Sequence, residues 1–299
     1  MKEFLNFNSG KISWFRCGGR IASYCIVENV NELNEALEKY SQYKDNLLVI
    51  GAGSNMLIRD GGFDGLAIKL TGEFNTINIK NKSEKEIYLT AGAGVFDKQV
   101  ASFALEHNLI GCEFLDTIPG TIGGAVKMNA GCFGKEVKDV LVSAKILTNG
   151  AVVELTNEDL CFSYRKSKIP DNAVILEATF LLQKVTNEQI VQSDMTISEM
   201  RKKRKENQIV GATCGSTFAN PMAQNGEKLS AWKLIDEVGM RGFAVGGAKF
   251  SEKHCNFLIN TGKATAKDIE ELIFLAKQKV KEKFNIELHE EIKIFGNQE

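Results

Sequence analysis

The chain has 299 residues, of which 43% are hydrophobic and 25% are charged, and its formal net charge at pH 7 is −1. These values are ordinary for a globular protein, and the balanced charge gives no reason to expect nucleic acid or an anionic membrane as a partner. The length predicts roughly two domains, because single hydrophobic cores stop growing near 250 to 300 residues.

The cysteines and the N-terminus indicate the compartment. The 7 cysteines are odd in number and scattered. They are never spaced as CxxC, which argues against a disulfide framework or a zinc site. The N-terminus lacks the basic start and apolar run of a secretory signal, and no segment reaches the roughly 18 consecutive apolar residues of a membrane span. We therefore expect a cytoplasmic, reduced protein with no metal site and no membrane partner.

Apolar periodicity and turn signals predict alternating helices and strands. In chain order we expect a helix from Asn31 to Tyr40, strands in 46–50 and 87–95, a helix around 100–104, a β-rich region over 140–182, a polar helix over 187–206, a helix after Thr265 and a strand in 291–296. Two signals are specific. Asn149 and Gly150 form a hairpin dipeptide, and Thr265 with Asp268 forms a capping box.

Three glycine-rich segments follow or flank apolar strands: GAGSN at 51–55, AGAG at 91–94 and IPGTIGGAVKMNAGCFG at 118–134. The dinucleotide fingerprint GxGxxG fails at the first, because its third glycine position is Met56 and no helix can open in LIRDGGFDG. The Walker pattern also fails. What remains is a nest of backbone N–H groups with Ser54 and Asn55, which can hold an anion, or a plain tight turn. Together the segments favour a large nucleotide cofactor.

Six blocks occur in an order that resembles the UDP-N-acetylenolpyruvoylglucosamine reductase family, flavoenzymes of bacterial cell-wall precursor synthesis. The blocks are VIGAGSNMLIRDGGFDG, FLDTIPGTIGGAVKMNAGCFG, SYRKS, CGSTFANP, GGAKFSEKHCNFLINTGKATAKDI and LHEEIKIFG, and the resemblance runs from about 14 to 296. The resemblance implies an α+β fold with a two-subdomain FAD-binding module of the vanillyl-alcohol-oxidase type and a C-terminal α+β substrate-binding domain. We expect the module at 1–190, with subdomains of about 1–70 and 71–190, and the C-terminal domain at 191–299.

The resemblance also implies FAD, held non-covalently, with NADPH as co-substrate. Residues matched to the diphosphate are Gly51, Ala52, Gly53, Ser54 and Asn55. Residues matched to the isoalloxazine and ribityl region are Pro119, Gly120, Gly123, Gly124, Asn129, Ala130 and Gly131. Here the glycines would remove side chains from faces where a flat ring system and a diphosphate approach the backbone.

The reaction implied is reduction of UDP-N-acetylglucosamine enolpyruvate to UDP-N-acetylmuramate. The matched catalytic residues are Arg165, which would stabilise charge on the substrate carboxylate, Ser216 as proton donor, and Glu291. Glu291 and Glu290 are adjacent in a strand, so only one can face the pocket. Read without the resemblance, Arg165 is a surface cation and Ser216 a turn residue.

The substrate's UDP portion would meet Tyr164, Asn220 and His254, with Lys205 a less certain addition. A lone histidine is otherwise more often a hydrogen-bonded structural residue. The run RKKRKE at 201–206 favours a solvated helix end over a nucleic-acid patch, since no aromatic residues interleave it.

Two departures from the family's pattern qualify the resemblance. A proline expected near Gln208 is missing, which leaves the course of 202–212 open, and the C-terminal domain is too short for an extra tyrosine-bearing loop, as in the second type of enzyme. Two other functions stay open: a different flavin oxidase or dehydrogenase of the same cofactor-binding fold, and a flavin or nucleotide-sugar binding protein without turnover. We expect a monomer or a weak oligomer.

Overall fold

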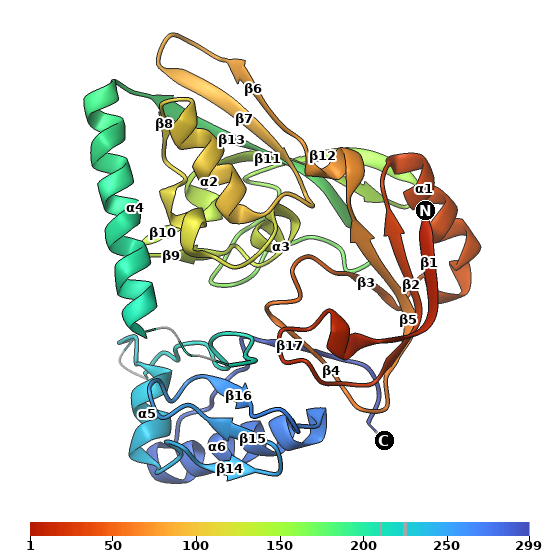
Figure 1. Cartoon of the computed structure of the whole chain (residues 1–299), viewed down its shortest axis with the longest axis vertical. Helices are drawn as coiled ribbons and strands as arrows, with labels where there is room; N and C mark the ends of the chain where they lie inside the picture. Colours follow the sequence, from red (N-terminus) through yellow and green to blue (C-terminus); the bar gives the residue numbers. More distant parts are fainter. Residues whose placement is uncertain (208, 210, 224–225, 299) are drawn as a thin grey trace. The chain divides into compact units, whose positions relative to one another are not determined.

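The computed structural model of the chain describes residues 1–207, 209, 211–223 and 226–298 (Figure 1). The chain divides into two compact units. Unit 1 comprises Met1–Phe4, Ser23–Ala52 and Gly65–Glu206, and unit 2 comprises Leu5–Ala22, Gly53–Asp64 and Asn207–Glu299. Each is described by itself below. The boundary expected at residues 190 and 191 falls within helix α4 (Asn187–Asn207).

The elements alternate along the chain. The strands are β1 (Lys2–Asn8), β2 (Arg20–Val27), β3 (Leu47–Val49), β4 (Met56–Ile58), β5 (Phe63–Leu70), β6 (Ile77–Asn81), β7 (Glu86–Gly92), β8 (Leu109–Ile110), β9 (Gly131–Cys132), β10 (Lys135–Glu136), β11 (Leu141–Thr148), β12 (Ala151–Thr156), β13 (Val174–Lys184), β14 (Ala244–Val245), β15 (Ala248–Phe250), β16 (Leu258–Asn260) and β17 (Lys293–Phe295). The α-helices are α1 (Val30–Lys39), α2 (Asp97–Glu106), α3 (Ile122–Lys127), α4 (Asn187–Asn207), α5 (Ala231–Glu237) and α6 (Ala266–Phe284). Short 3₁₀ helices include η4 (Glu113–Thr117).

A six-stranded sheet forms the centre of unit 1. Its order is β12-β11-β13-β7-β6, and β8 pairs with β13. β11 and β12 form the predicted hairpin, where Asn149 and Gly150 adopt positive φ angles of 48° and 74°. Such a pair suits the turn whose twist matches the flanking strands. Figure 1 shows α2 and α3 beside this sheet, and α3 packs on β13 and β7.

A four-stranded sheet has the order β1-β2-β5-β3. β3 runs parallel to β5, with Leu47 opposite Leu66. α1 begins at Asn29, whose side chain accepts the N–H of Glu32 at 2.9 Å. The helix buries Leu33 and Ala36 in the core of unit 1, as its apolar spacing predicts.

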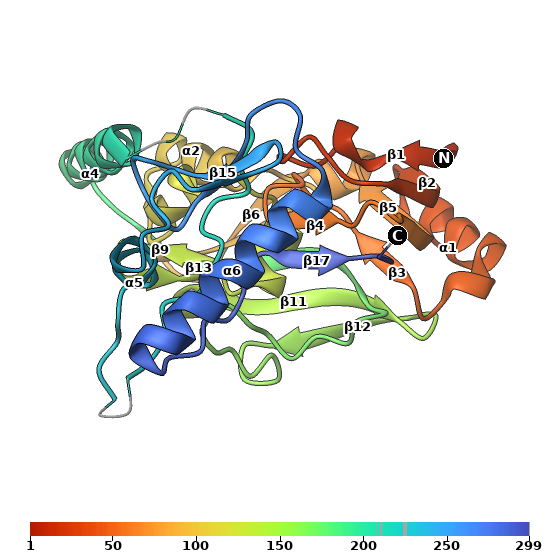
Figure 2. The same ribbon diagram turned by 90° about the horizontal axis from the view of Figure 1, so that it is seen from below.

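In unit 2, α6 packs on the three-stranded sheet β14-β15-β16. The predicted capping box is present: the Thr265 hydroxyl accepts the Asp268 N–H at 3.1 Å, and the Asp268 carboxylate accepts the Thr265 N–H at 3.0 Å. The buried face of α6 includes Ile269, Leu272 and Val280. Figure 2 shows α6 with β17 beside it. β17 pairs in parallel with β4.

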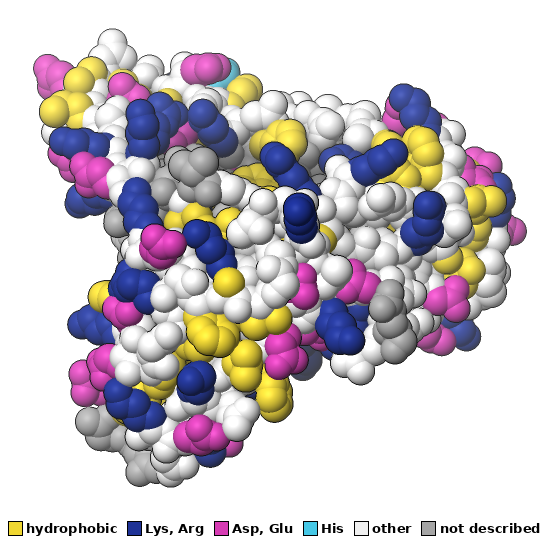
Figure 3. Space-filling model, turned by 60° about the horizontal axis from the view of Figure 1, so that its bottom comes forward, with side chains coloured by type: hydrophobic (Ala, Val, Ile, Leu, Met, Phe, Trp, Pro, Cys, Tyr) yellow, Lys and Arg dark blue, Asp and Glu magenta, His cyan; other side chains and the backbone are white. Residues whose placement is uncertain are grey.

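The predicted elements are confirmed, including the polar helix α4 and the final strand β17. All 7 cysteines are free thiols, and 5 of them are buried. No helix in the described part of the chain is long and apolar enough to cross a membrane. Lys and Arg side chains are interspersed with Asp and Glu over the face in Figure 3. Gln208 and Val210, on which the course of 202–212 depends, lie outside the described residues.

Candidate active site

The turn at 51–55 carries a row of unused backbone donors. The Ile50 N–H still bonds to the carbonyl of Ile68 at 2.8 Å, but the N–H groups of 51–55 donate to no acceptor in the described chain. No helix follows, since β4 begins at Met56. Consecutive backbone donors in a turn form a concavity that holds anions. The turn therefore fits the diphosphate of a dinucleotide.

Two glycines of this turn are required by the protein's own packing. A Cβ on Gly51 would lie 2.4 Å from Thr121 Oγ1. A Cβ on Gly53, whose φ is +69°, would lie 1.9 Å from the carbonyl oxygen of Ile12. Glycine at these positions is explained without a ligand.

The segment 118–134 is the loop expected from sequence to surround the flavin and is called the flavin loop below. It passes from η4 through α3 to the β9–β10 hairpin. A Cβ on Gly120 would lie 2.5 Å from Asp97 Oδ2, and one on Gly131 would lie 2.4 Å from the Lys135 carbonyl oxygen. At Gly123 the nearest atom is 3.1 Å away. Gly124 is exposed, and its nearest neighbour would be 3.9 Å away. Of Gly120, Gly123, Gly124 and Gly131, only Gly124 has open space where a Cβ would lie, so the need for a ligand to explain glycine is limited to that one of the four.

Asp97 is a buried carboxyl group against the flavin loop. It is the first residue of α2, its backbone N–H bonds to the Gly120 carbonyl at 3.1 Å, and it has no solvent exposure. Neither carboxyl oxygen has a hydrogen-bond partner in the described structure. Burial raises the pKa of Asp97 well above its usual range, so the group is stabilised in its neutral form.

Asn129 joins three parts of unit 1. It is fully buried with φ at +41°. Its side-chain amide donates to Glu136 Oε2 at 3.0 Å and to the Ser163 carbonyl at 3.1 Å, and its Oδ1 accepts the Lys138 N–H at 3.1 Å. This side chain is thus used within the protein. The expected contact of Asn129 with the flavin stays a prediction.

Arg165 is held against the flavin loop. Its guanidinium donates to the carbonyl of Gly131 at 2.8 Å and of Asn129 at 3.4 Å, and it lies 4.0 Å from Glu136. It also lies 5.0 Å from the centre of the Tyr164 ring. The backbone of Arg165 is left-handed, with φ at +57°, and 23% of its side chain is exposed. Arg165 is therefore an oriented, partly accessible cation rather than a solvated one.

In unit 2, backbone hydrogen bonds hold the segments that contain Ser216 and Glu291 next to each other. Ser216 bridges Phe257, and the next residue, Thr217, accepts the Glu291 N–H on its carbonyl at 2.8 Å. Glu290 forms an ion pair with Lys277 of α6 at 2.7 Å. The Glu290 carboxylate is therefore engaged within unit 2.

The residues matched to the UDP portion differ in exposure and bonding. Asn220 Oδ1 accepts the Ala231 N–H at the start of α5 at 3.0 Å, which leaves its amide group to donate. His254 Nδ1 accepts the Asn256 N–H at 3.3 Å, and burial lowers the pKa of His254. A neutral ring with Nδ1 as acceptor carries its proton on Nε2 and can donate there. Tyr164 belongs to unit 1 and is 38% exposed.

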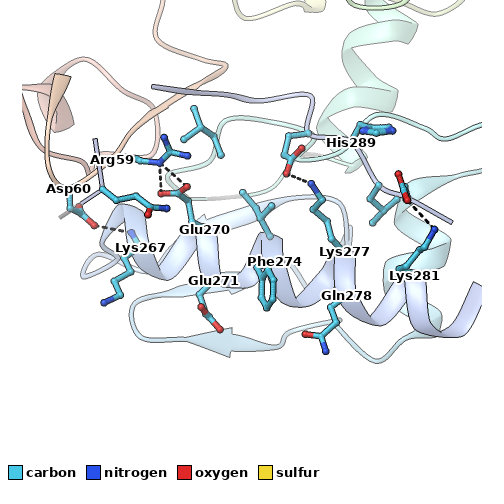
Figure 4. A pocket seen from close by; sticks show the side chains of 16 residues that line it. Arg59, Asp60, Lys267, Glu270, Glu271, Phe274, Lys277, Gln278, Lys281 and His289 are labelled. Atoms are coloured by element: carbon cyan, nitrogen blue, oxygen red, sulfur yellow. Dashed lines mark hydrogen bonds and ion pairs between the residues drawn. The ribbon is translucent and has the colours of Figure 1, made fainter. Parts of the chain in front are cut away.

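A cavity of about 910 Å³ lies within unit 2 along α6 (Figure 4). Phe274 projects from α6 between Lys267 and Lys277, and Arg59 pairs with Glu270 at one end. None of the expected site residues lines it. The cavity is therefore separate from the groups identified by sequence.

Two features of unit 1 were missed by sequence reasoning. One is the Asp97 carboxyl. The other is a bidentate ion pair between Asp116 in η4 and Arg201 in α4, with N–O distances of 2.7 and 2.6 Å. The run RKKRKE at 201–206 is exposed, and Arg201 within it is held by this ion pair. No group of three or more His, Cys, Asp or Glu side chains suited to a metal ion occurs in the described chain.

Comparison with known proteins accounts for nearly the whole chain. A family model described as the C-terminal domain of UDP-N-acetylenolpyruvoylglucosamine reductase matches residues 206–295, and one described as an FAD binding domain matches residues 21–156. The UDP-N-acetylenolpyruvoylglucosamine reductase of Paramagnetospirillum magneticum is 44% identical over 95% of this chain and 89% of its own length. That of Rickettsia massiliae is 39% identical over 97% of this chain and 95% of its own.

A solved structure is also similar. The crystal structure of UDP-N-acetylenolpyruvylglucosamine reductase from Thermus caldophilus aligns with a TM-score of 0.81 and 32% identity, covering 99% of this chain and 98% of that one. Together with the FAD-domain match, this alignment confirms the expected α+β fold with an FAD-binding module and a C-terminal domain.

Proposed function

Since the chain belongs to the UDP-N-acetylenolpyruvoylglucosamine reductase family, we propose that it reduces UDP-N-acetylglucosamine enolpyruvate to UDP-N-acetylmuramate with NADPH as hydride source. It is an FAD-dependent oxidoreductase. The observation that carries the proposal is the fixed guanidinium of Arg165 on the Gly131 carbonyl, within the loop expected to surround the flavin.

FAD, when bound, would supply the two-electron redox chemistry that links NADPH to the substrate. The row of N–H donors at 51–55 would hold the diphosphate. Gly124 would allow close approach of the ring system or ribityl chain, since a Cβ there would meet open space. Pro119, Gly120, Gly123, Asn129, Ala130 and Gly131 would form the rest of the loop around the cofactor.

The overall change adds a hydride to the terminal carbon of the enol double bond and a proton to the adjacent carbon. Negative charge develops on the substrate carboxylate between these two steps. Arg165 would stabilise that charge, because a guanidinium presents a rigid fork of donors to a carboxylate. Its bonds to the flavin loop support this role, since they orient the cation before substrate arrives.

Ser216 would supply the proton. A hydroxyl is a weak acid, but the carbanion left by hydride addition, delocalised into the carboxylate, is strongly basic, so a positioned O–H can transfer its proton to it. Glu291 would share a proton with the substrate carboxyl group. The engagement of Glu290 with Lys277 supports Glu291 as the member of the pair that faces substrate.

Three residues would recognise the UDP portion. The Nε2–H of His254 and the side-chain amide of Asn220 would donate to its oxygens, since the other polar atom of each side chain is bonded within unit 2. Tyr164 would present its exposed ring and hydroxyl. A diphosphate needs such donors rather than a broadly basic surface, consistent with the chain's net charge of −1.

The proposal is tested by following the two half-reactions separately without oxygen. NADPH should bleach the flavin, and the enolpyruvyl substrate should restore its oxidised spectrum with formation of the lactyl ether. Arg165→Lys should slow the second step by about 10²- to 10³-fold, the range seen when a single charge-stabilising donor is lost. The matched control is Lys166→Ala, which removes an exposed neighbouring cation and should leave both steps unchanged. Reoxidation by air but not by substrate would instead indicate another flavin oxidase.

A further inference from the structure

α4 is attached to the rest of unit 1 by one narrow stripe. Among its described side chains only Ile197 is fully buried, although the helix spans Asn187–Asn207. Ser193, Ile197 and Arg201 are spaced by four residues, so they lie on the same face of the helix. Docking of α4 therefore depends on few contacts.

Two of these three residues bond to η4. Ser193 Oγ donates to Glu113 Oε1 at 2.8 Å. Arg201 donates Nε and Nη2 to the two oxygens of Asp116 at 2.7 and 2.6 Å. Asp116 is only 2% exposed, whereas Arg201 is 47% exposed. A buried carboxylate without a cation is costly in free energy. Burial of Asp116 therefore favours the position of α4 in which Arg201 is bound to it, called the docked position below.

Asp116 is also directly connected to the flavin loop. The next residue, Thr117, is buried, and its hydroxyl lies 3.2 Å from the sulfur of Cys132. Cys132 in turn donates to the Phe114 carbonyl at 3.3 Å. Thr117, the neighbour of Asp116, thus links the start of the flavin loop to Cys132 near its end. The carboxylate that Arg201 binds is therefore joined to the flavin loop through its neighbour Thr117.

We propose that the Asp116–Arg201 ion pair couples FAD binding to the docking of α4, the helix through which the chain leaves unit 1. The proposal rests on the proposed function, because it takes the flavin loop as the cofactor's site. Asp116 and Arg201 are positioning residues, since they act through the loop and the helix rather than on a reacting atom. By linkage, FAD favours the docked helix and the docked helix favours FAD by the same factor.

The basic run at 201–206 provides the test, because a helix must open before trypsin cleaves it, and a released α4 should open more readily than a docked one. The full chain is digested at limiting and at saturating FAD, and cleavage within 201–206 is quantified by mass. In the wild type, saturating FAD should slow this cleavage by about tenfold, within the usual range for coupled sites. In Asp116→Asn, which keeps every trypsin site, the effect of FAD should fall below about threefold.

A pair of variants controls for the loss of a cleavage site. Arg201→Gln and Lys202→Gln each remove one site from the same turn, but Lys202 makes no recorded ion pair in the described structure. Arg201→Gln should lose the effect of FAD, and Lys202→Gln should keep it. The dissociation constant of FAD, measured from flavin fluorescence, should rise in Asp116→Asn and Arg201→Gln by the factor lost in the digestion assay.

Equal effects of FAD in Arg201→Gln and Lys202→Gln would overturn the coupling, as would a wild type that binds FAD with no change in cleavage. A wild type that bound no FAD would overturn the proposed function as well, so the two failures are distinguishable. Far-UV circular dichroism checks that each variant is folded. If Asp116→Asn is unfolded, Arg201→Lys replaces it, because a lysine keeps the charge without the bidentate fork and should retain an intermediate effect.

Discussion

Asn129 and Arg165 of unit 1 are held differently from Ser216 and Glu291 of unit 2. Asn129 and Arg165 are fixed by bonds from their own side chains. Ser216 and Glu291 are fixed by backbone pairing, through the Ser216–Phe257 bridge and the Glu291 N–H on Thr217. Substitution of Asn129 should therefore lower stability and function together, whereas substitution of Ser216 should lower activity and leave stability nearly unchanged.

The largest difference between the effect on activity and the effect on stability is expected at Ser216. Ser216→Ala should slow reoxidation of the reduced flavin by substrate by about 10²- to 10⁴-fold, the usual contribution of a positioned acid. The free energy of unfolding should change by less than about 0.5 kcal/mol, since the backbone bridge remains. Anaerobic stopped-flow absorbance and urea unfolding measure the two quantities. Ser230→Ala in the same unit is the control. A wild-type reoxidation rate in Ser216→Ala would exclude this serine as proton donor.

At Asn129, stability and cofactor binding should fall together. Asn129→Ala removes three side-chain hydrogen bonds at a fully buried position and should cost about 3 kcal/mol of unfolding free energy. FAD should be lost on gel filtration. Asn149→Ala is the matched control, because it also has a positive φ but lies in an exposed hairpin turn. If both variants lost the same stability, the strained backbone rather than the bonds would explain the effect.

Gly120 and Gly124 of the flavin loop should differ in the same respect, because substitution of one lowers stability and substitution of the other lowers FAD binding. Gly120→Ala should cost about 2 kcal/mol of stability, because its Cβ would lie 2.5 Å from Asp97 Oδ2 in a packed site. Gly124→Ala should leave the stability of the FAD-free chain unchanged or higher but weaken FAD binding, since its face is open. Urea unfolding and FAD titration measure both. Replacing Asp97 with Ala should relieve part of the cost of Gly120→Ala; purely additive effects would contradict this contact.

The smallest expected effect is a pH dependence from Asp97. Burial raises the pKa of Asp97 in the folded protein, whereas the pKa of an aspartate in an unfolded chain is about 3.9. The folded state therefore binds more protons above that pH, and the contribution of Asp97 to stability falls as pH rises. The stability of Asp97→Asn relative to wild type should increase from pH 5 to pH 7. A constant difference in urea unfolding between these pH values would show that the carboxyl is not held neutral.

Much of the fold could be predicted because its signals are local. Asn149 and Gly150 define a hairpin, and Thr265 with Asp268 caps α6, all within a few residues. The missed contacts are not local. Asp116 and Arg201 are separated by 85 residues, and nothing in either segment marks its partner. Asp97 reads as an ordinary N-terminal helix residue, because burial of its carboxyl depends on Gly120 and the packed sheet.

In the candidate site, too, contacts between residues far apart in the sequence could not be predicted. The turn at 51–55 was predicted as a donor nest, and its N–H groups are unused in the described structure. The reason for glycine there was only partly predicted, because Gly51 and Gly53 are needed by contacts with Thr121 and Ile12. Glycines in a sequence mark the positions where the backbone carries no side chain. They do not tell whether another part of the protein or a ligand occupies that space.

The central claim is that this chain passes electrons from NADPH to an enolpyruvyl ether. The most direct measurement is anaerobic stopped-flow of the flavin spectrum, first with NADPH and then with UDP-N-acetylglucosamine enolpyruvate. The account predicts bleaching followed by rapid return of the oxidised spectrum, with one lactyl ether formed per flavin reoxidised. A flavin that stays reduced with this substrate would contradict the account.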